Sequence, residues 1–393
     1  MCVGYFWHDF TQTPVYFANS AEALLQQVVG QNFIDQFAYP ILEEIHQQVI
    51  GHIGELFNAP DKCELIGTAT VGSSEAIMLG LLAHKFTWRR QREQTRQPSD
   101  RPNIVMGNNV HVCWEKFSLY FDVPSRVIPV ETNQCILTAD QVAKEIDENT
   151  IAVSCVLGNT YTAQLDEIAN INDLLLSVKQ ERGWDIPIHV DAAIGGFITP
   201  FAHPELQWDF RLEQVKSINV SNHKFGLVYP GMGTLLFRDR SVLPEELVFD
   251  VSYMGNVLSN YGLNFSRPSA MVLLQYYNFL RLGKAGYRQI VLETLEKAQA
   301  LESKLLATGY FETVSDSNYL PILVLRLKHP YAHPTFAVEL SQKLRERHWV
   351  VPSYALPLTT NTIQVLRLVV KQNWTFDMIE LITKDIEEIM TCY

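Results

Sequence analysis

A serine, a histidine and a lysine follow an apolar segment near the middle of the chain. The segment is 215–220, and Ser221-Asn222-His223-Lys224 comes directly after it, before a glycine-rich return. Open α/β sheets bind their ligands beyond the carboxyl ends of the strands, so this segment would place a hydroxyl, an imidazole and an amine at a ligand site. Alone, the four residues are more typical of a solvated loop, and the rest of the chain has to decide.

A short glycine- and serine-rich segment is the second candidate. Gly72-Ser73-Ser74-Glu75 follows the apolar residues 65–70 and precedes a helical pattern that reaches Arg92. The first amides of a helix lack internal partners and lie at the positive end of its dipole, so they suit an anion such as phosphate. The same residues fit a capping box with a serine as N-cap, and both interpretations stay open. The Gly-Lys-Ser/Thr ending of a P-loop is missing.

Ionisable side chains also interrupt apolar segments. Asp191 ends the segment 186–190, where a carboxylate needs a partner such as a cationic ring nitrogen, unless it caps a helix. A metal is the other option, but we expect the nearest histidine, His189, to point to the opposite face. A histidine in the position of His111 is more often a core residue. Arg367 should lie at a sheet edge or bind a carboxylate with two nitrogens.

Pyridoxal phosphate chemistry uses all of these groups together. A lysine forms a Schiff base with the cofactor, an aspartate keeps the ring nitrogen protonated, and the ring then acts as an electron sink. A helix N-terminus binds the phosphate, a histidine stacks on the ring and an arginine binds the substrate α-carboxylate. The order along the chain fits, because the serine segment is followed by His111, Asp191, Lys224 and Arg367.

Strands and helices alternate through the part of the chain that carries these residues. The expected strands are 65–70, 103–106, 126–130, 151–157, 186–190 and 215–220. Such alternation predicts right-handed β-α-β units and a mostly parallel sheet with both faces covered. Two helices, 267–282 and 286–308, then lead to a smaller pattern of strands and helices. We expect an arm over 1–35, a large domain over 36–294 and a small α+β domain over 295–393.

Composition excludes several classes of protein. The chain has 393 residues, of which 47% are hydrophobic, and its net charge of −12 argues against a nucleic-acid partner. No apolar segment reaches the roughly 18 residues that span a bilayer, and no secretory leader is visible at the N-terminus. The six cysteines are scattered without a C-x-x-C pair. We therefore expect reduced thiols in a cytoplasmic protein and no metal site.

Many separated segments resemble the glutamate-decarboxylase group of pyridoxal-phosphate-dependent decarboxylases. They include Asn32-Phe33-Ile34-Asp35, Gly72-Ser73-Ser74-Glu75-Ala76, Cys113-Trp114-Glu115-Lys116-Phe117, Asp147-Glu148-Asn149-Thr150-Ile151, Val190-Asp191-Ala192-Ala193, Ser221-Asn222-His223-Lys224-Phe225-Gly226 and Asn264-Phe265-Ser266-Arg267-Pro268. The resemblance implies fold type I, with a seven-stranded, mostly parallel sheet flanked by helices and a small C-terminal domain. It also implies pyridoxal 5'-phosphate as cofactor and an α-decarboxylase of glutamate or a related L-amino acid.

The resemblance further implies a role for each matching residue. Lys224 would bind the cofactor covalently, Asp191 would pair with the ring nitrogen, and His111 and Ala193 would enclose the ring. Tyr253 or His111 would return a proton to the α-carbon. The phosphate would be bound by Ser73, Ser74, Ser221 and His223, with Ser266 contributed by a second subunit, which implies a homodimer with its sites at the interface. The substrate would contact Arg367, Asn32, Asp35 and Thr11, and Thr160 would lie near the cofactor ring oxygen or the substrate carboxylate.

Some positions depart from the family pattern and leave the substrate open. Ile194 replaces the usual serine after Asp-Ala-Ala, Asn222 replaces the glycine before His-Lys, and the segment 254–258 differs. Aspartate, cysteine sulfinate or an aromatic amino acid are alternative substrates, and a different pyridoxal phosphate reaction is a second hypothesis. A hydrolase using Ser221 or Ser73 with His223 and Asp191 is a third, although no G-x-S-x-G elbow exists. An inactive cofactor-binding partner protein is a fourth.

Overall fold

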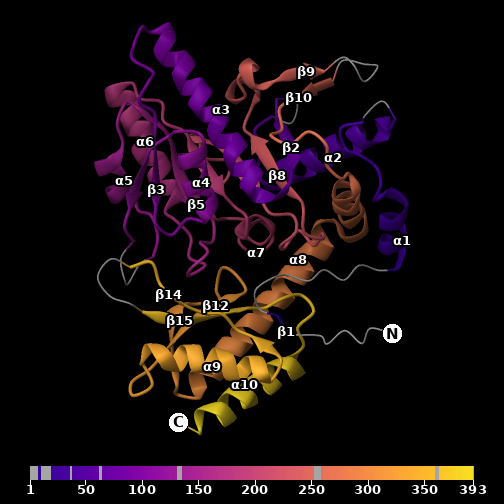
Figure 1. The fold of residues 1–393 in the computed structure, drawn as a ribbon, viewed down its shortest axis with the longest axis vertical. Helices are drawn as coiled ribbons and strands as arrows, with labels where there is room; N and C mark the ends of the chain where they lie inside the picture. Colours follow the sequence, from indigo (N-terminus) through magenta and orange to yellow (C-terminus); the bar gives the residue numbers. More distant parts are fainter. Residues whose placement is uncertain are drawn as a thin grey trace.

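A seven-stranded sheet organises the larger part of the molecule (Figure 1). The computed structural model describes residues 8–9, 19–35, 38–61, 64–130, 135–251, 258–358 and 363–392. In spatial order the strands are β2 (Ile66–Thr70), β8 (Gly233–Phe237), β7 (Val215–Val220), β6 (Ile188–Asp191), β5 (Thr150–Val156), β3 (Asn103–Gly107) and β4 (Ser125–Ile128). Because β8 is antiparallel to both neighbours and the other pairs are parallel, the predicted mostly parallel sheet is confirmed.

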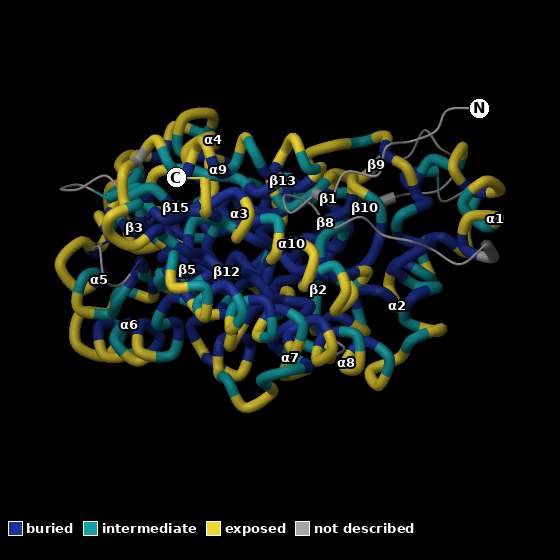
Figure 2. The backbone as a smooth tube through the Cα atoms, turned by 90° about the horizontal axis from the view of Figure 1, so that it is seen from below, coloured by how far each residue is buried: buried dark blue, intermediate teal, exposed yellow. Residues whose placement is uncertain are grey.

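Helices cover both faces of this sheet, as the alternating pattern predicts. They are α2 (Pro40–Leu56), α3 (Gly72–Gln94), α4 (Val112–Tyr120), α5 (Ala139–Glu145), α6 (Ile168–Arg182) and α7 (Thr199–Ala202), while α1 (Asn19–Val28) packs against the long helix α8 (Ala270–Ala307) instead. Every residue of β3, β5, β6 and β8 is buried, and Figure 2 shows these strands as the dark centre of the molecule. Strands buried on both faces consist of almost continuous apolar residues, so polar side chains within them need a specific partner.

A second, antiparallel sheet forms the smaller part at the C-terminal end (Figure 1). Its strands, in spatial order, are β11 (Phe311–Ser315), β12 (Ile322–Leu327), β15 (Gln364–Val369) and β14 (Ser353–Ala355). The helices α9 (Pro334–Glu346) and α10 (Phe376–Met390) pack with it around a separate apolar core that runs from Ala298 to Met390. The domain boundary at residue 295 stays a prediction. The short β1 (His8–Asp9) pairs with β13 (Trp349–Val350) of this part.

The helix α8 (Ala270–Ala307) connects the two parts. Its backbone leaves the helical region at Gly283, where φ is 57° and ψ is −172°. Glycine adopts a positive φ without the steric cost that a Cβ atom brings, so the helix direction changes there. Two helical segments separated near this residue were expected from the sequence, and the structure agrees. A short hairpin of β9 (Phe249–Val251) and β10 (Leu258–Asn260) precedes α8.

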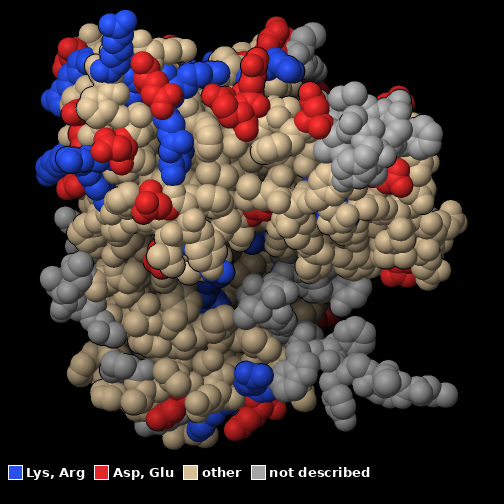
Figure 3. Space-filling model, turned by 45° about the horizontal axis from the view of Figure 1, so that its top comes forward, with Lys and Arg blue, Asp and Glu red and all other residues tan. Residues whose placement is uncertain are grey.

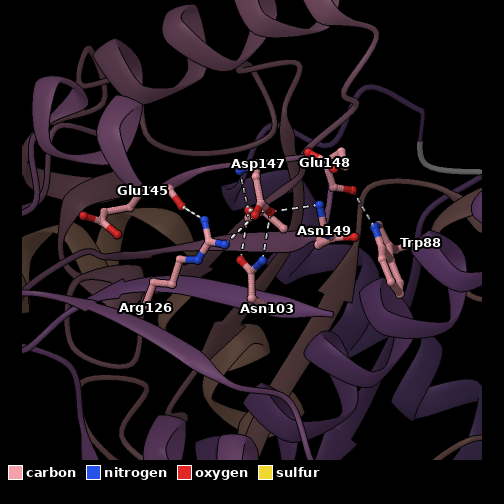
Figure 4. Close-up of polar contacts among 8 residues, drawn as sticks. Trp88, Asn103, Arg126, Glu145, Asp147, Glu148 and Asn149 are labelled. Carbon is pink, nitrogen blue, oxygen red and sulfur yellow. Dashed lines mark hydrogen bonds and ion pairs between the residues drawn. The ribbon is translucent and has the colours of Figure 1, made fainter. Parts of the chain in front are cut away.

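The Asp147 carboxylate joins several segments at the amino ends of β3 and β5 (Figure 4). It accepts hydrogen bonds from Asn103 Nδ2 at 2.9 Å, from the backbone amide of Asn149 at 2.9 Å and from Arg126. Trp88 Nε1 donates to the adjacent Glu148 carbonyl at 3.0 Å. Ligands bind at the carboxyl edge of such a sheet, whereas Asp147 lies at the opposite edge. The segment 147–151, which is one of those that resemble the decarboxylases, therefore contributes to the fold and not to the ligand site.

We expect Asp147→Asn to lower the free energy of unfolding by about 1–3 kcal/mol, the usual cost of weakening hydrogen bonds to a charged group that is partly buried. Burial raises the pKa of Asp147, but the bonds from Asn103 and Arg126 lower it further, so the net shift is downward. A lowered carboxyl pKa stabilises the fold above the ordinary pKa of about 3.9, and this contribution disappears as the pH falls below that value. Urea unfolding at pH 7 and pH 3.5 tests this, because the difference between the two proteins should shrink at the lower pH. An equal difference at both pH values would contradict the assignment.

Candidate active site

A cavity of about 330 Å³ lies where the carboxyl edge of the large sheet meets the small sheet. Figure 3 shows a hollow between the two parts of the molecule, with basic atoms visible in it. Its lining residues are His111, Thr160, Ile194, His223, Lys224, Phe225, Pro230, Ile322, Arg367 and Val369. Residues far apart in sequence therefore meet here, and five of the predicted site residues are among them, namely His111, Thr160, His223, Lys224 and Arg367. A larger cavity of about 480 Å³ lies elsewhere between the two parts and contains none of these five.

Lys224 projects into this cavity from the turn after β7. Its backbone amide bonds to the Ser221 carbonyl at 3.1 Å, which fixes the turn. Burial lowers the pKa of the Lys224 amine, the Asp191 carboxylate partly opposes that shift, and the Arg367 guanidinium adds to it. A lowered pKa leaves more of the amine neutral at a given pH, and the neutral amine is the form that attacks a carbonyl carbon.

The Asp191 carboxylate lies at the carboxyl end of β6 and is 4% exposed. Its Oδ1 accepts hydrogen bonds from Asn219 Nδ2 at 2.8 Å and from the Ala193 amide at 3.1 Å, and its Oδ2 accepts one from Trp114 Nε1 at 3.4 Å. Hydrogen bonds donated to a carboxylate stabilise its charged form. Our sequence analysis missed Asn219 and Trp114, although polar residues at 217, 219 and 221 alternate along a buried strand and were a usable signal.

The expectation that His189 points away from Asp191 is wrong. Side chains two residues apart on a strand share a face, and His189 and Asp191 both bond to Asn219 on the neighbouring strand. His189 is fully buried beside Trp114, with ring centroids 5.4 Å apart. Its position does not suggest a metal ligand, and the described residues contain no cluster of three or more metal-binding side chains.

The serine segment forms a tight turn at the start of α3. Ser73 Oγ lies 2.6 Å from Ser221 Oγ, so the segment and the end of β7 meet. A Cβ atom on Gly233 would come within 2.5 Å of the Gly72 carbonyl carbon, and Gly72 itself has φ 72°, so the turn requires both glycines. The N-cap is Val71 and makes no side-chain cap bond, so a serine N-cap is wrong. The helix start and two hydroxyls suit a phosphate.

His111 is the N-cap of α4 rather than a core residue. Its side chain is exposed at the cavity, and its Nδ1 accepts a hydrogen bond from the Cys113 amide at 3.3 Å. The surrounding cavity wall partly desolvates the His111 ring and so lowers its pKa. The Asp191 carboxylate partly opposes this shift, and the charge of Lys224 reinforces it. A neutral ring that accepts at Nδ1 carries its proton on Nε2, so His111 can donate a proton from that atom.

Arg367 lies on an interior strand, since β15 pairs with both β12 and β14. The alternative position at a sheet edge is therefore wrong. Within the described residues, its buried Nε has no hydrogen-bond partner, and burial lowers the pKa of its guanidinium while Tyr354 partly opposes the shift. A buried guanidinium nitrogen without a partner costs free energy, and a carboxylate bound in the cavity would remove that cost.

The remaining predicted residues lie elsewhere. Asn32 Nδ2 donates to Ser266 Oγ at 3.2 Å, and neither residue lines the cavity of this chain, nor does Asp35. Ser74 contacts the Cys113 thiol, and Ala193 contributes its amide to Asp191. Thr11 and Tyr253 lie outside the described residues.

The unusual Asn222 is fully buried behind the lysine and does not line the cavity. It donates to Gln275 Oε1 at 3.0 Å and accepts from the Thr234 hydroxyl at 2.8 Å. Its amide therefore ties the lysine turn to β8 and α8. Ile194, by contrast, lines the cavity and is the departure that a substrate would meet.

A hydrolytic triad is not formed by the candidate residues. His223 Nδ1 donates to the Met232 carbonyl at 2.8 Å, and the Asp191 carboxylate is bonded by Trp114, Ala193 and Asn219 instead of by a histidine. The two serines bond to each other. These contacts leave no Ser-His-Asp series of the kind that activates a hydroxyl nucleophile.

The fold and the site together define a pyridoxal phosphate enzyme of fold type I. The residues present fit the cofactor: Lys224 suits its aldehyde, Asp191 its ring nitrogen, His111 its ring face, and Ser73 and Ser221 its phosphate. When bound, pyridoxal phosphate supplies an electron sink for a bond broken at the substrate α-carbon.

Comparison with known proteins identifies the family. Residues 7–328 match the model of the pyridoxal-dependent decarboxylase conserved domain. A glutamate decarboxylase of Petunia hybrida is 41% identical over 371 residues, which cover 94% of this chain and 74% of that protein. Glutamate decarboxylase beta of Listeria innocua is 41% identical over 380 residues, covering 96% of this chain and 82% of its own. The solved glutamate decarboxylase of Lactobacillus brevis superposes with a TM-score of 0.93 at 37% identity, covering 98% of this chain and 88% of that one.

The chain therefore belongs to the pyridoxal-dependent decarboxylase family, as the resemblance implied. It is a pyridoxal-phosphate-dependent carboxy-lyase. A sphingosine-1-phosphate lyase of Burkholderia pseudomallei has the same fold, with a TM-score of 0.82 at 20% identity.

Proposed function

We propose that this enzyme removes the α-carboxylate of L-glutamate and releases carbon dioxide and the corresponding amine. The choice of glutamate as substrate rests on the 41% identity to glutamate decarboxylases over more than nine-tenths of the chain. The position of Arg367 supports an amino acid as substrate, because its buried Nε has no hydrogen-bond partner among the described residues and its side chain shares the cavity with Lys224.

The side chains of the cavity have separate tasks in this proposal. Arg367 binds the α-carboxylate and so sets the direction in which it leaves. Lys224 would hold the cofactor covalently through its amine, which lies in the same cavity as Arg367. The Nε2 proton of His111, or the hydroxyl proton of Tyr253, is returned to the α-carbon. Thr160 lines the cavity between these groups, where it can donate to the cofactor ring oxygen or to the substrate.

A homodimer in the cytoplasm is part of the same proposal. Asn32, Asp35 and Ser266 do not line the cavity of their own chain, so they would complete a site only from a second copy. The four cysteines in the described ranges are free thiols, of which Cys113, Cys135 and Cys155 are buried, and reduced thiols are typical of the cytoplasm. Within the same ranges, no helix has both the length and the apolar character needed to cross a membrane.

A substrate panel tests the proposal. Purified protein loaded with pyridoxal phosphate is given glutamate, aspartate, cysteine sulfinate and the aromatic amino acids, and carbon dioxide and amine are measured. We expect kcat/KM for glutamate to exceed that for aspartate by at least about tenfold, because a methylene changes transition-state binding by roughly 10- to 200-fold. A preference for another amino acid would move the assignment to that substrate. An aldehyde or ketone in place of the amine would indicate a different pyridoxal phosphate reaction.

A further inference from the structure

A series of hydrogen bonds runs from Asp191 into the interior, away from the cavity. Asn219 Nδ2 bonds to Asp191 Oδ1 at 2.8 Å, and Asn219 Oδ1 lies 2.8 Å from His189 Nε2. The other ring nitrogen, His189 Nδ1, lies 2.7 Å from Ser217 Oγ, and this hydroxyl lies 2.7 Å from His84 Nε2. We call these residues, from His84 to Asp191, the relay. All five are at most 4% exposed.

The chemistry of the groups fixes the direction of every bond in the relay. An ionised carboxylate only accepts, so Asn219 must turn its amide nitrogen to Asp191 and its carbonyl oxygen to His189. That oxygen only accepts, so His189 carries its proton on Nε2, and its Nδ1 must accept from the Ser217 hydroxyl. The serine oxygen then accepts from His84 Nε2. All the hydrogen bonds of the relay are therefore donated in the same direction, from His84 towards the Asp191 carboxylate.

Neutral histidines are required for this order, and burial provides them. Burial lowers the pKa of His84 to about 3, with His189 and Lys216 reinforcing the shift. Burial also lowers the pKa of His189 to about 4, which the bond to Asn219 and the charge of Asp191 partly oppose. The charged groups that face the two rings are Lys216 at one end and Asp191 at the other. Both rings stay neutral at physiological pH.

The packing around His189 shows that the fold makes room for its ring. Gly80 lies within α3, and a Cβ atom there would come within 2.7 Å of His189 Cε1. A glycine in the interior of a helix lowers the stability of that helix. Here it allows the helix backbone to approach the His189 ring closely, which a residue with a Cβ atom would prevent. At the far end, His84 borders a second cavity of about 360 Å³ at the amino ends of β5 and β6.

We propose that His189, Asn219, Ser217 and His84 are positioning residues that hold the Asp191 carboxylate in place, so that it can pair with the cofactor ring nitrogen. Cooperative series of hydrogen bonds in a low-dielectric interior strengthen the last acceptor bond, here the one on Asp191. This inference rests on the proposed cofactor role of Asp191. It adds to that role four residues that do not line the active-site cavity.

Paired variants of His189 test the relay. His189→Leu keeps a similar volume but removes both ring nitrogens, whereas His189→Gln keeps a donor within reach of Asn219 Oδ1. His46→Leu is the matched control, because His46 is also a buried histidine, 4% exposed, and accepts from the Ala69 amide on β2, outside the relay. The measurements are the Kd of the cofactor-free protein for pyridoxal phosphate, the pH midpoint of the visible absorbance band, and the urea midpoint of unfolding.

We expect His189→Leu to raise the Kd by about 10- to 100-fold, the range seen when outer partners of a bound group are removed, and to move the pH midpoint of the band. His189→Gln should recover most of both values, and His46→Leu should lower the urea midpoint without changing either. Ser217→Ala should change both in the same direction by less, and it carries the test if His189→Leu does not fold.

Three results would overturn the inference. The first is a Kd and a band midpoint that stay at the wild-type values in His189→Leu or, if that protein does not fold, in Ser217→Ala. The second is a change in His46→Leu as large as that in His189→Leu, which would indicate a general loss of packing. The third is a His189→Gln protein no better than His189→Leu, which would exclude the donor order. Failure of the proposed function looks different, because the wild-type protein itself would then bind no pyridoxal phosphate or release no carbon dioxide.

Discussion

Replacing Lys224 by alanine is expected to lower the rate of carbon dioxide release by at least about 1,000-fold, within the range attributed to a single group that transfers protons or attacks a carbonyl. The amine lies at the carboxyl end of β7, in the cavity that also contains His111 and Arg367, and burial lowers its pKa. In the proposed mechanism, removing this amine would leave the cofactor without the residue that holds it.

The measurement pairs activity with a spectrum. Wild-type protein should show a visible absorbance band that borohydride removes, and Lys224→Ala should show no borohydride-sensitive bond to the protein. Lys144→Ala, which removes an exposed lysine of α5, is the control and should retain both activity and band. Normal carbon dioxide release by Lys224→Ala would exclude the mechanism proposed here.

Replacing Arg367 by glutamine should reduce kcat/KM for glutamate by roughly 10- to 150-fold, since hydrogen bonds to a charged group contribute about 1.5–3 kcal/mol and each 1.4 kcal/mol is a factor of ten. The buried Nε has no partner among the described residues, so a bound carboxylate is the group that would satisfy it. Arg367→Lys should recover only part of the loss, because an ammonium group cannot bind a carboxylate through two parallel hydrogen bonds.

A neighbouring arginine provides the control for this variant. Arg326 lies on β12, the strand that pairs with β15, and its Nε forms an ion pair with Glu312 Oε1 at 2.7 Å, away from the active-site cavity. Arg326→Gln should leave kcat/KM within about twofold, since isolated ion pairs at the surface contribute little. Steady-state kinetics of the three variants, with the cofactor band recorded for each, separate substrate binding from cofactor binding. Equal losses in Arg326→Gln and Arg367→Gln would contradict the role of Arg367.

The order of strands and helices could be read from the sequence because it depends on local patterns. Buried parallel strands are short apolar segments, and the intervening helices have their own period, so β2, β3, β5, β6 and β7 fell close to their expected positions. The antiparallel β8 was not expected as a strand. Its residues follow a glycine-rich turn, and they form a strand through their pairing with β2 and β7.

The sequence by itself determined the type of chemistry, because a lysine, an aspartate and a helix-start serine segment at strand ends suit one cofactor, and the family resemblance rests on the same residues. The tertiary structure decided how these residues are supported. It placed Arg367 on an interior strand beside Lys224, removed Asn222 from the cavity and put Ile194 into it. It also reversed the expected direction of His189, and through Asn219 it joined that ring to Asp191. The two-residue period of a strand already places His189 and Asp191 on one face. Which residues they meet on the neighbouring strand depends on register and packing across many residues, and the local pattern does not determine these.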